Sequence, residues 1–225
     1  MYTEKEIRDK LTLTKNFSPT GNFVAISVTV NDLGQAHHSA LIIRYNGINY
    51  YYHFDKHDVH LKPFELKLAD KVFHKRLEII DERLIASFLN HCKIIAKTAK
   101  PQYGYFYGGS FYENGVYHTD KNLPQLMTCV GFCINVLTGF VEEKNYLEYS
   151  DWQVVTNKAE KWFNDFVVEL KKKFPKVDVE ELRKDFRRIK PSELISSAYF
   201  NKLPIRKVQT DSVKVIVEEA FKASV

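Results

Sequence analysis

Apolar stretches in the first quarter of the chain predict an antiparallel sheet. Residues 23 to 30, FVAISVTV, are β-branched or apolar at strand length, which is typical of a buried strand. Two further strands are expected over residues 38 to 45 and 48 to 54, joined by Asn46-Gly47. Because Asn-Gly is the strongest short signal for a two-residue hairpin turn, these two strands are predicted to pair with each other.

A continuous apolar run in residues 126 to 140, LMTCVGFCINVLTGF, predicts the helix around which the chain is organised. Thr128 is a favourable N-cap residue, so the helix is expected to begin at Cys129. Gly139 is the residue type that most easily takes the left-handed conformation after a helix, so the helix is expected to stop there.

Spacing of apolar residues and capping signals predict the remaining elements. Helices are expected over residues 3–11, 81–97, 157–174 and 179–188, with a short helix opening at Pro191. Strands are expected over residues 203–208 and 213–217, and residues 57–72 are predicted as loop with one strand. Together these elements predict an α+β fold in one domain, residues 1–225, whose central antiparallel sheet packs against the helix that starts at Cys129.

Composition indicates an ordinary globular protein. Of the 225 residues 44% are hydrophobic and 27% are charged, and no stretch approaches the ~18 apolar residues of a membrane span. The first residues lack the apolar core of a signal peptide. The net charge is +5, but the basic residues are spread among acidic ones, so no nucleic-acid partner is expected. Oligomeric state is left open.

The three cysteines, Cys92, Cys129 and Cys133, lack the CxxC spacing of a zinc site or a disulfide framework. Reduced thiols, a cytoplasmic location, and no metal or cofactor are therefore expected. A thiolate at Cys129 would face the unpaired amides of a helix start, which lower a thiol pKa and favour a nucleophile. Cys92 and Cys133 fall on apolar faces and are interpreted as packing residues. The alternative is that all three cysteines are core.

A thiol nucleophile needs a base, and all eight histidines precede Cys129 in the chain. If Asn46-Gly47 forms the turn, His38, His53 and Asp55 share one sheet face, and His37 points to the other. The hairpin register thus predicts His38 as the base, within about 4 Å of the Cys129 sulfur, with His53 or Asp55 holding its second ring nitrogen.

Gly and Tyr are concentrated in residues 102 to 115, QYGYFYGGSFYENG, just before the cysteine helix. Paired glycines permit close backbone approach, and tyrosines offer apolar bodies with polar tips. The segment is interpreted equally well as a cleft wall or as a surface loop anchored by aromatic residues.

Several short motifs resemble the NlpC-type papain-fold cysteine peptidases. TCVGFC, residues 128–133, is similar to their DCSGFV-type nucleophile motif, and YFYGG, residues 105–109, is similar to their YxWGG segment. HSALII, residues 38–43, followed by Asn46-Gly47 and Tyr52-His53, resembles their HVGIYLG-NG-IH hairpin. Here the cysteine follows the hairpin, as in the circularly permuted branch that includes YiiX-like hydrolases, lecithin retinol acyltransferase-like proteins and PPPDE-type peptidases. Residues 189–197, IKPSELISS, also look like a segment near the C-terminus of YiiX-like members.

This resemblance implies a permuted papain-like fold with Cys129 as nucleophile, His38 as general base and His53 as the third polar residue. It also implies that Tyr105 lines the substrate site, and Tyr107 and Asp55 are expected to line it as well. The activity so implied is a cysteine peptidase, amidase or esterase that acts through a thioester on a small-molecule, peptide or lipid substrate. Two alternatives remain open, a thiol acyltransferase of the lecithin retinol acyltransferase-like type and a non-catalytic ligand-binding module on the same fold.

Overall fold

The computed structural model describes residues 2–104, 109–119, 124–141, 145–155, 161–179, 182 and 184–224. Its helices are α1 (Glu4–Lys10), α2 (Ile85–Thr98), α3 (Cys129–Phe140), α4 (Lys161–Lys173), α6 (Pro191–Ser197) and α7 (Lys207–Lys222). Its strands are β1 (Thr12–Leu13), β2 (Phe23–Val30), β3 (Ala36–Tyr45), β4 (Ile48–Phe54), β5 (Val59–Pro63), β6 (Val72–Arg76), β7 (Gln102–Tyr103), β8 (Phe111–Glu113), β9 (Val116–His118) and β10 (Leu126–Met127).

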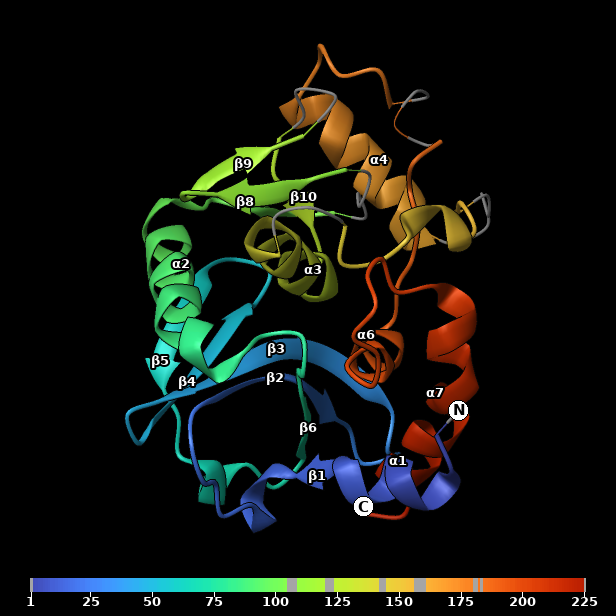
Figure 1. Cartoon of the computed structure of the whole chain (residues 1–225). Helices are drawn as coiled ribbons and strands as arrows, with labels where there is room; N and C mark the ends of the chain where they lie inside the picture. The colour runs from blue at the N-terminus through green and yellow to red at the C-terminus, as the bar shows by residue number, and fades with distance from the viewer. Residues whose placement is uncertain are drawn as a thin grey trace.

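A six-stranded sheet of antiparallel neighbours forms the base of the molecule, in the order β1-β6-β2-β3-β4-β5 (Figure 1). The strand predicted over residues 23 to 30 is confirmed as β2. The predicted hairpin is also confirmed, because Tyr45 pairs with Ile48 and both Asn46 and Gly47 have positive φ. Among the described residues the α+β class is therefore established.

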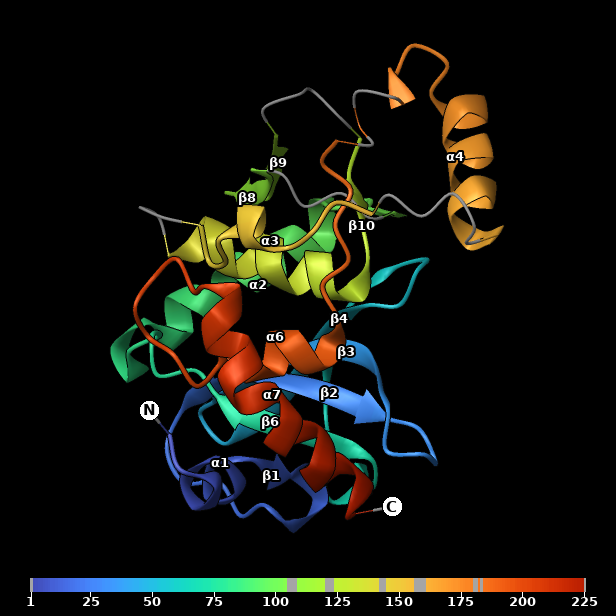
Figure 2. The ribbon, with the colours of Figure 1, turned by 90° about the vertical axis from the view of Figure 1, so that its right-hand side faces the viewer.

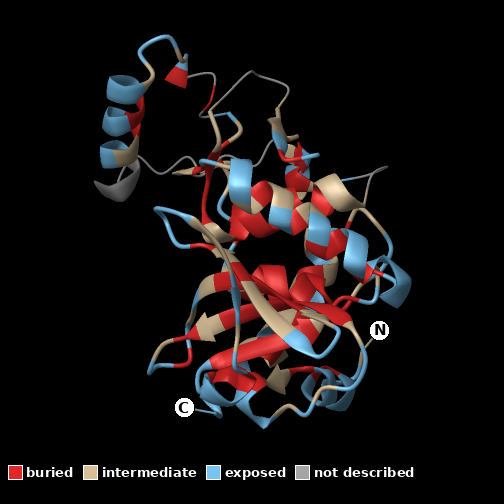
Figure 3. Ribbon diagram, turned by 90° about the vertical axis from the view of Figure 1, so that its left-hand side faces the viewer, coloured by how far each residue is buried: buried red, intermediate tan, exposed pale blue. Residues whose placement is uncertain are grey.

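The two faces of this sheet have different coverings. Helices α2, α3 and α6 lie over one face (Figures 1 and 2), which carries the large apolar side chains of the main core, Val24, Ile26, Val28, Leu41 and Ile43. The opposite face carries a smaller cluster of Phe23, Ala25, Ile42 and Leu66, packed against Phe17 and Phe64. Figure 3 shows buried residues along the central strands and along the inner sides of α2 and α3.

Helix α3 begins where the sequence predicts and extends one residue further. The hydroxyl of Thr128 accepts a hydrogen bond of 3.2 Å from the backbone N–H of Gly131, so Thr128 is the N-cap. The expectation that the helix stops at Gly139 is wrong, because Gly139 lies within the last helical turn. A Cβ at Gly139 would lie 1.7 Å from the carbonyl oxygen of Tyr112, so glycine is there because β8 approaches the helix closely.

The end of the chain differs from the sequence prediction. Residues 203–208 and 213–217 were expected as strands because of their β-branched content, but residues 207–222 form helix α7. Its buried residues Val213, Val217 and Phe221 recur every four positions, which is the spacing of one helix face, whereas Val215 is 60% exposed. The helical spacing of the apolar residues therefore outweighs their β propensity here.

Most other helix predictions agree with the structure, since α1, α2 and α6 match the helices expected over residues 3–11, 81–97 and from Pro191. Strand β6 was not predicted. The helix expected over residues 157–174 corresponds to α4, and residues 157–160 lie outside the described residues, as does part of the stretch 179–188.

Helix α4 stands apart from the main core (Figure 2), packed on a separate cluster that includes Leu126, Val167, Leu170, Leu182 and Phe186. Within the described ranges, no helix has both the length and the apolar character needed to cross a bilayer.

Candidate functional site

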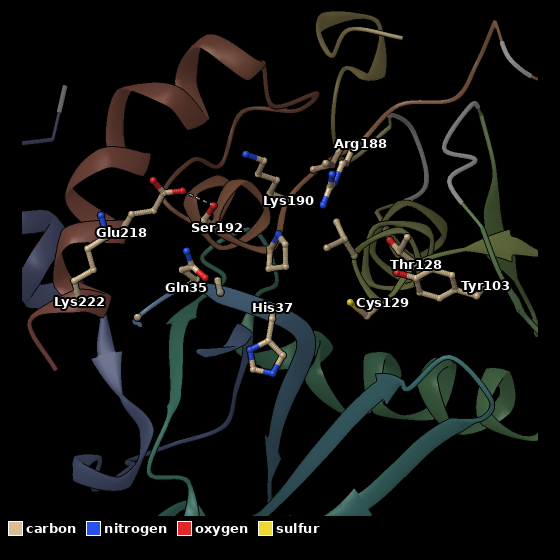
Figure 4. Close-up of a pocket in the computed structure, with 15 residues that line it drawn as sticks. Gln35, His37, Tyr103, Thr128, Cys129, Arg188, Lys190, Ser192, Glu218 and Lys222 are labelled. Carbon is tan, nitrogen blue, oxygen red and sulfur yellow. Dashed lines mark hydrogen bonds between the residues drawn. The ribbon is translucent and has the colours of Figure 1, made fainter. Parts of the chain in front are cut away.

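Cys129 and His37 line one cavity of about 600 Å³ at the junction of several elements. The cysteine comes from the first turn of α3 and the histidine from β3, and both residues line this space (Figure 4). The remaining wall is formed by the β2–β3 turn, Tyr103 of β7, the segment before α6, and α7. We call this space the Cys129 cavity.

The Cys129 thiol is half-buried and surrounded by backbone donors. The nearby backbone N–H groups of Ser39, Val130 and Cys129 itself favour the thiolate. Burial outweighs them and raises the pKa of the Cys129 thiol above its ordinary value. The N–H groups at the helix start thus act in the expected direction, but the expectation of a lowered pKa is wrong because burial has the larger effect.

The other two thiols are core residues, as predicted. Cys92 and Cys133 are fully buried, and burial raises the pKa of each well above its ordinary value. Cys129 is thus the thiol with the best access and with the smallest burial penalty on its charged form.

His38 does not join Cys129. Its Nε2 lies 3.1 Å from Nδ1 of His53, so the two rings share a hydrogen bond, as the hairpin register predicts. Both rings lie on the face that carries Ala25 and Ile42, however, whereas Cys129 packs against the main core on the other face. The structure therefore separates the predicted base and its partner from the thiol, and places His37 in the cavity instead.

The hairpin register is as predicted, but the sheet face that α3 covers is the one opposite His38. His38 lies on the same face as Thr29, which is directly opposite it, and as Ala40 and Ile42, which follow at every second position of β3. The helix covers the other face because larger apolar side chains emerge there. The sequence holds this signal, since residues 24–30 alternate between Val or Ile and the smaller Ala, Ser and Thr. A bulge between Thr29 and Val30, which leaves His37 as the extra residue of β3, could not be read from the sequence.

Asp55 contributes to a different cluster. Its carboxylate accepts hydrogen bonds from the backbone N–H groups of His57 and Asp58, and from Nε2 of His60 at 2.6 Å. These donors lower the pKa of Asp55, with the backbone N–H groups as the largest cause. Asp55 does not line the Cys129 cavity. Tyr105 and Tyr107 lie outside the described residues, so their expected place near the substrate stays a prediction.

Sequence reasoning missed the basic wall of the cavity. Arg188, Lys190 and Lys222 line it together with Glu218 and Gln35. The sequence offers one local signal, the alternation of Arg188, Ile189 and Lys190, in which a buried apolar residue separates two exposed cations. Lys222 approaches from α7, whose helical character the sequence analysis did not recognise.

Within the described ranges, no group of three or more His, Cys, Asp or Glu side chains is arranged to hold a metal ion. No family model matches the chain, and neither a curated protein nor a solved structure matches it.

Proposed function

We propose that the protein is a cysteine hydrolase that cleaves an amide or ester bond through a thioester at Cys129. One observation carries this proposal, namely that a thiol at a helix start and an imidazole from the neighbouring sheet line the same cavity. A thiol, a base and nearby backbone donors are the parts that such a reaction needs.

In the proposed reaction His37 takes the proton from the Cys129 thiol, and the thiolate attacks the carbonyl carbon of the substrate. The tetrahedral intermediate collapses to a thioester as the amine or alcohol leaves with the proton from His37. His37 then deprotonates a water molecule, which attacks the thioester and releases the acid and the free thiol. The backbone N–H groups of Cys129 and Val130, at the start of α3, are the proposed donors to the oxyanion.

The order of the elements supports a permuted papain-like fold as part of this proposal. The hairpin β3–β4 precedes the cysteine helix in the chain, which is the order of the permuted branch that the motifs resemble. We place the enzyme in the cytoplasm because its three cysteines are free thiols. A small-molecule, peptide or lipid substrate fits the proposal equally, and acyl transfer differs only in using an amine or alcohol in place of water.

A non-catalytic binding module is the second candidate. Burial raises the pKa of Cys129, and the more elaborate histidine arrangement of His38 with His53 lies on the other sheet face. Both observations favour a cavity that binds a ligand without forming a bond to it.

Acetylation by p-nitrophenyl acetate tests the choice between the two. We expect an acetyl adduct on Cys129, detected by peptide mass spectrometry, and a release of nitrophenolate that the Cys129→Ala variant abolishes. The His37→Ala variant should acylate more slowly by roughly 100-fold or more, the usual effect of losing a general base.

His38→Ala is the matched control, because its ring points to the opposite face and its removal should change the acylation rate by less than about threefold. Equal losses in both variants would contradict His37 as the base. A folded wild-type protein that gives no adduct on Cys129 would favour the binding module.

A further inference from the structure

A second cavity lies beside the Cys129 cavity and shares one wall with it. It has a volume of about 420 Å³ and lies between α4, the strands β7 and β10, and the turn between β4 and β5. We call this space the α4 cavity. Tyr103 of β7 lines both cavities, and Figure 4 draws its ring near Thr128, at the Cys129 end of the first one. The two spaces are therefore neighbours with Tyr103 as their common wall.

The strand that leads into the cysteine helix fixes how far apart the two cavities are. Leu126 of β10 lines the α4 cavity, and Thr128, two residues later, lines the Cys129 cavity. Both project to the same side of the extended backbone, whereas Met127 between them packs in the main core. Two residues of a strand span about 7 Å. A group attached to a carbonyl at Cys129 therefore reaches the α4 cavity with a chain of only a few carbon atoms.

The floor of the α4 cavity is apolar. It is formed by the buried Leu126 and Leu170 and by the half-buried Phe166 and Phe174. A Cβ added at Gly104 would lie 3.0 Å from the Leu126 side chain and 3.1 Å from the Phe166 ring, so α4 packs directly on the segment that continues β7. An apolar ligand that covers such a floor is stabilised by the removal of apolar surface from water.

Charges at the rim of the α4 cavity balance each other. Among the described lining residues, Lys56 and Lys173 carry positive charge, Asp58 and Glu169 carry negative charge, and all four are exposed. A rim with equal numbers of both signs has no net charge with which to concentrate an ionic ligand. An apolar floor with a mixed polar rim is instead suited to an uncharged apolar group.

We infer that the α4 cavity binds an uncharged apolar group of the substrate while the substrate's carbonyl lies at Cys129. This inference rests on the proposed function and adds a substrate class to it, namely acyl compounds that carry an alkyl chain or an aromatic ring within a few atoms of the scissile bond. Tyr103 is then a specificity-determining residue, because the apolar group must pass its ring to enter the α4 cavity.

Two alkylating agents that differ only in an apolar chain test the inference without any catalytic turnover. Iodoacetamide lacks the chain and N-hexyl-iodoacetamide carries it, and in both the Cys129 sulfur displaces iodide from carbon. The ratio of their rates at Cys129, hexyl over unsubstituted, is read by tandem mass spectrometry and cancels differences in thiolate population. We expect this ratio to exceed that of the urea-unfolded chain by about tenfold, which corresponds to burial of about two methylene groups.

Glu169→Trp fills the α4 cavity from its rim, so it should return the ratio to about the value of the unfolded chain. Asp165→Trp is the matched control, since Asp165 is also acidic and exposed, lies one turn earlier on α4, and is outside the cavity lining. It should keep the wild-type ratio. In the wild type, the hexyl adduct should also slow hydrogen exchange in residues 164–173 by roughly tenfold relative to the acetamide adduct, because the chain covers the inner side of α4.

A ratio that is equal in the folded wild type and in the unfolded chain, or that Glu169→Trp leaves unchanged, would overturn the inference. The acetylation experiment would then still decide the proposed function, because p-nitrophenyl acetate transfers a group too short to reach the α4 cavity. A raised ratio together with no acetyl adduct on Cys129 would contradict the proposed function and leave the α4 cavity as a binding site for apolar groups.

Discussion

His74 shows how a single buried residue couples the stability of this protein to pH. It is 1% exposed and packs against Phe17 and Phe23, with Nδ1 2.9 Å from the hydroxyl of Thr14. Its Nε2 is buried without a hydrogen-bond partner among the described residues. Burial lowers the pKa of His74 to about 4, because a charged ring has little to solvate it there.

We predict that the free energy of unfolding falls as the pH drops from about 6.5 to about 4. In that window the unfolded chain binds a proton at residue 74 and the native chain does not, so acid favours unfolding. Burial and the nearby His38 and His60 also lower the pKa of His53 to about 4, which adds to the loss with the same sign. The His74→Phe variant should remove about 2–3 kcal/mol of the pH-dependent loss, measured by urea denaturation across this range.

Thr14→Val is the matched control, since it removes the hydroxyl partner and keeps the imidazole. It should lower stability at every pH and retain the steep dependence below pH ~6.5. A His74→Phe variant whose pH dependence equals that of the wild type would show that His74 is not the coupled residue.

At the scale of elements, α3 and the short strand β8 pack closely because Gly139 has no side chain. The backbone of Tyr112 in β8 approaches Gly139 so closely that a methyl group has no room. We predict that Gly139→Ala costs about 3 kcal/mol or more, because helix and strand must move apart inside a packed core. Chemical denaturation measures this loss.

Gly47→Ala is the comparison, since nothing lies within 4 Å of its added methyl group and only its φ of 80° opposes the change. We expect it to cost about 1–2 kcal/mol, the usual penalty for a left-handed residue with a side chain. Equal costs for the two variants would show that close packing at Gly139 is not the reason for the glycine.

The elements that the sequence predicted correctly are those with local signals. The Asn46-Gly47 turn and the Thr128 cap both depend on residues adjacent in the chain, and both are in place. The arrangement of the site depends on a long-range feature, the face of the sheet that α3 covers. The prediction for His38 assumed the wrong face. The larger apolar side chains determine which face is covered. Val24, Ile26 and Val28 pack against the helices on the face opposite His38 and His53.

The basic wall of the Cys129 cavity was beyond local signals for the same reason. Arg188 and Lys222 are more than thirty residues apart in the chain, and they line one cavity only because α6 packs on β3 and α7 packs on α6. Recognising α7 as a helix would have placed Val213, Val217 and Phe221 on one face, but it would not have shown which cavity its last turn approaches.

At the scale of the whole molecule, two separate apolar clusters suggest unequal local stability. The main core joins both ends of the chain, and Phe221 of α7 packs on Phe73 of β6 with ring centroids 4.9 Å apart. The cluster below α4 is much smaller and includes Phe186, whose ring lies 5.5 Å from that of Phe166. Fewer buried contacts make a region easier to open without global unfolding.

We predict that Phe186→Ala opens α4 locally while leaving the main core intact. Backbone amides within residues 164–173 should exchange with solvent at least roughly 100-fold faster, since a buried Phe→Ala change costs about 3–5 kcal/mol where the residue packs. The global unfolding transition in denaturant should move by less than about 1 kcal/mol. Hydrogen exchange followed by mass spectrometry and denaturation by urea measure the two effects.

Phe221→Ala is the matched variant in the main core, and it should lower the global free energy of unfolding by about 3–5 kcal/mol. This pair also tests the expectation of a single domain over residues 1–225, because both clusters share one chain and α4 is joined to the rest through Leu126 beside α3. If Phe186→Ala lowers global stability as much as Phe221→Ala does, the two clusters unfold as one cooperative unit. A separate second transition in the wild type would instead make the α4 region a domain of its own.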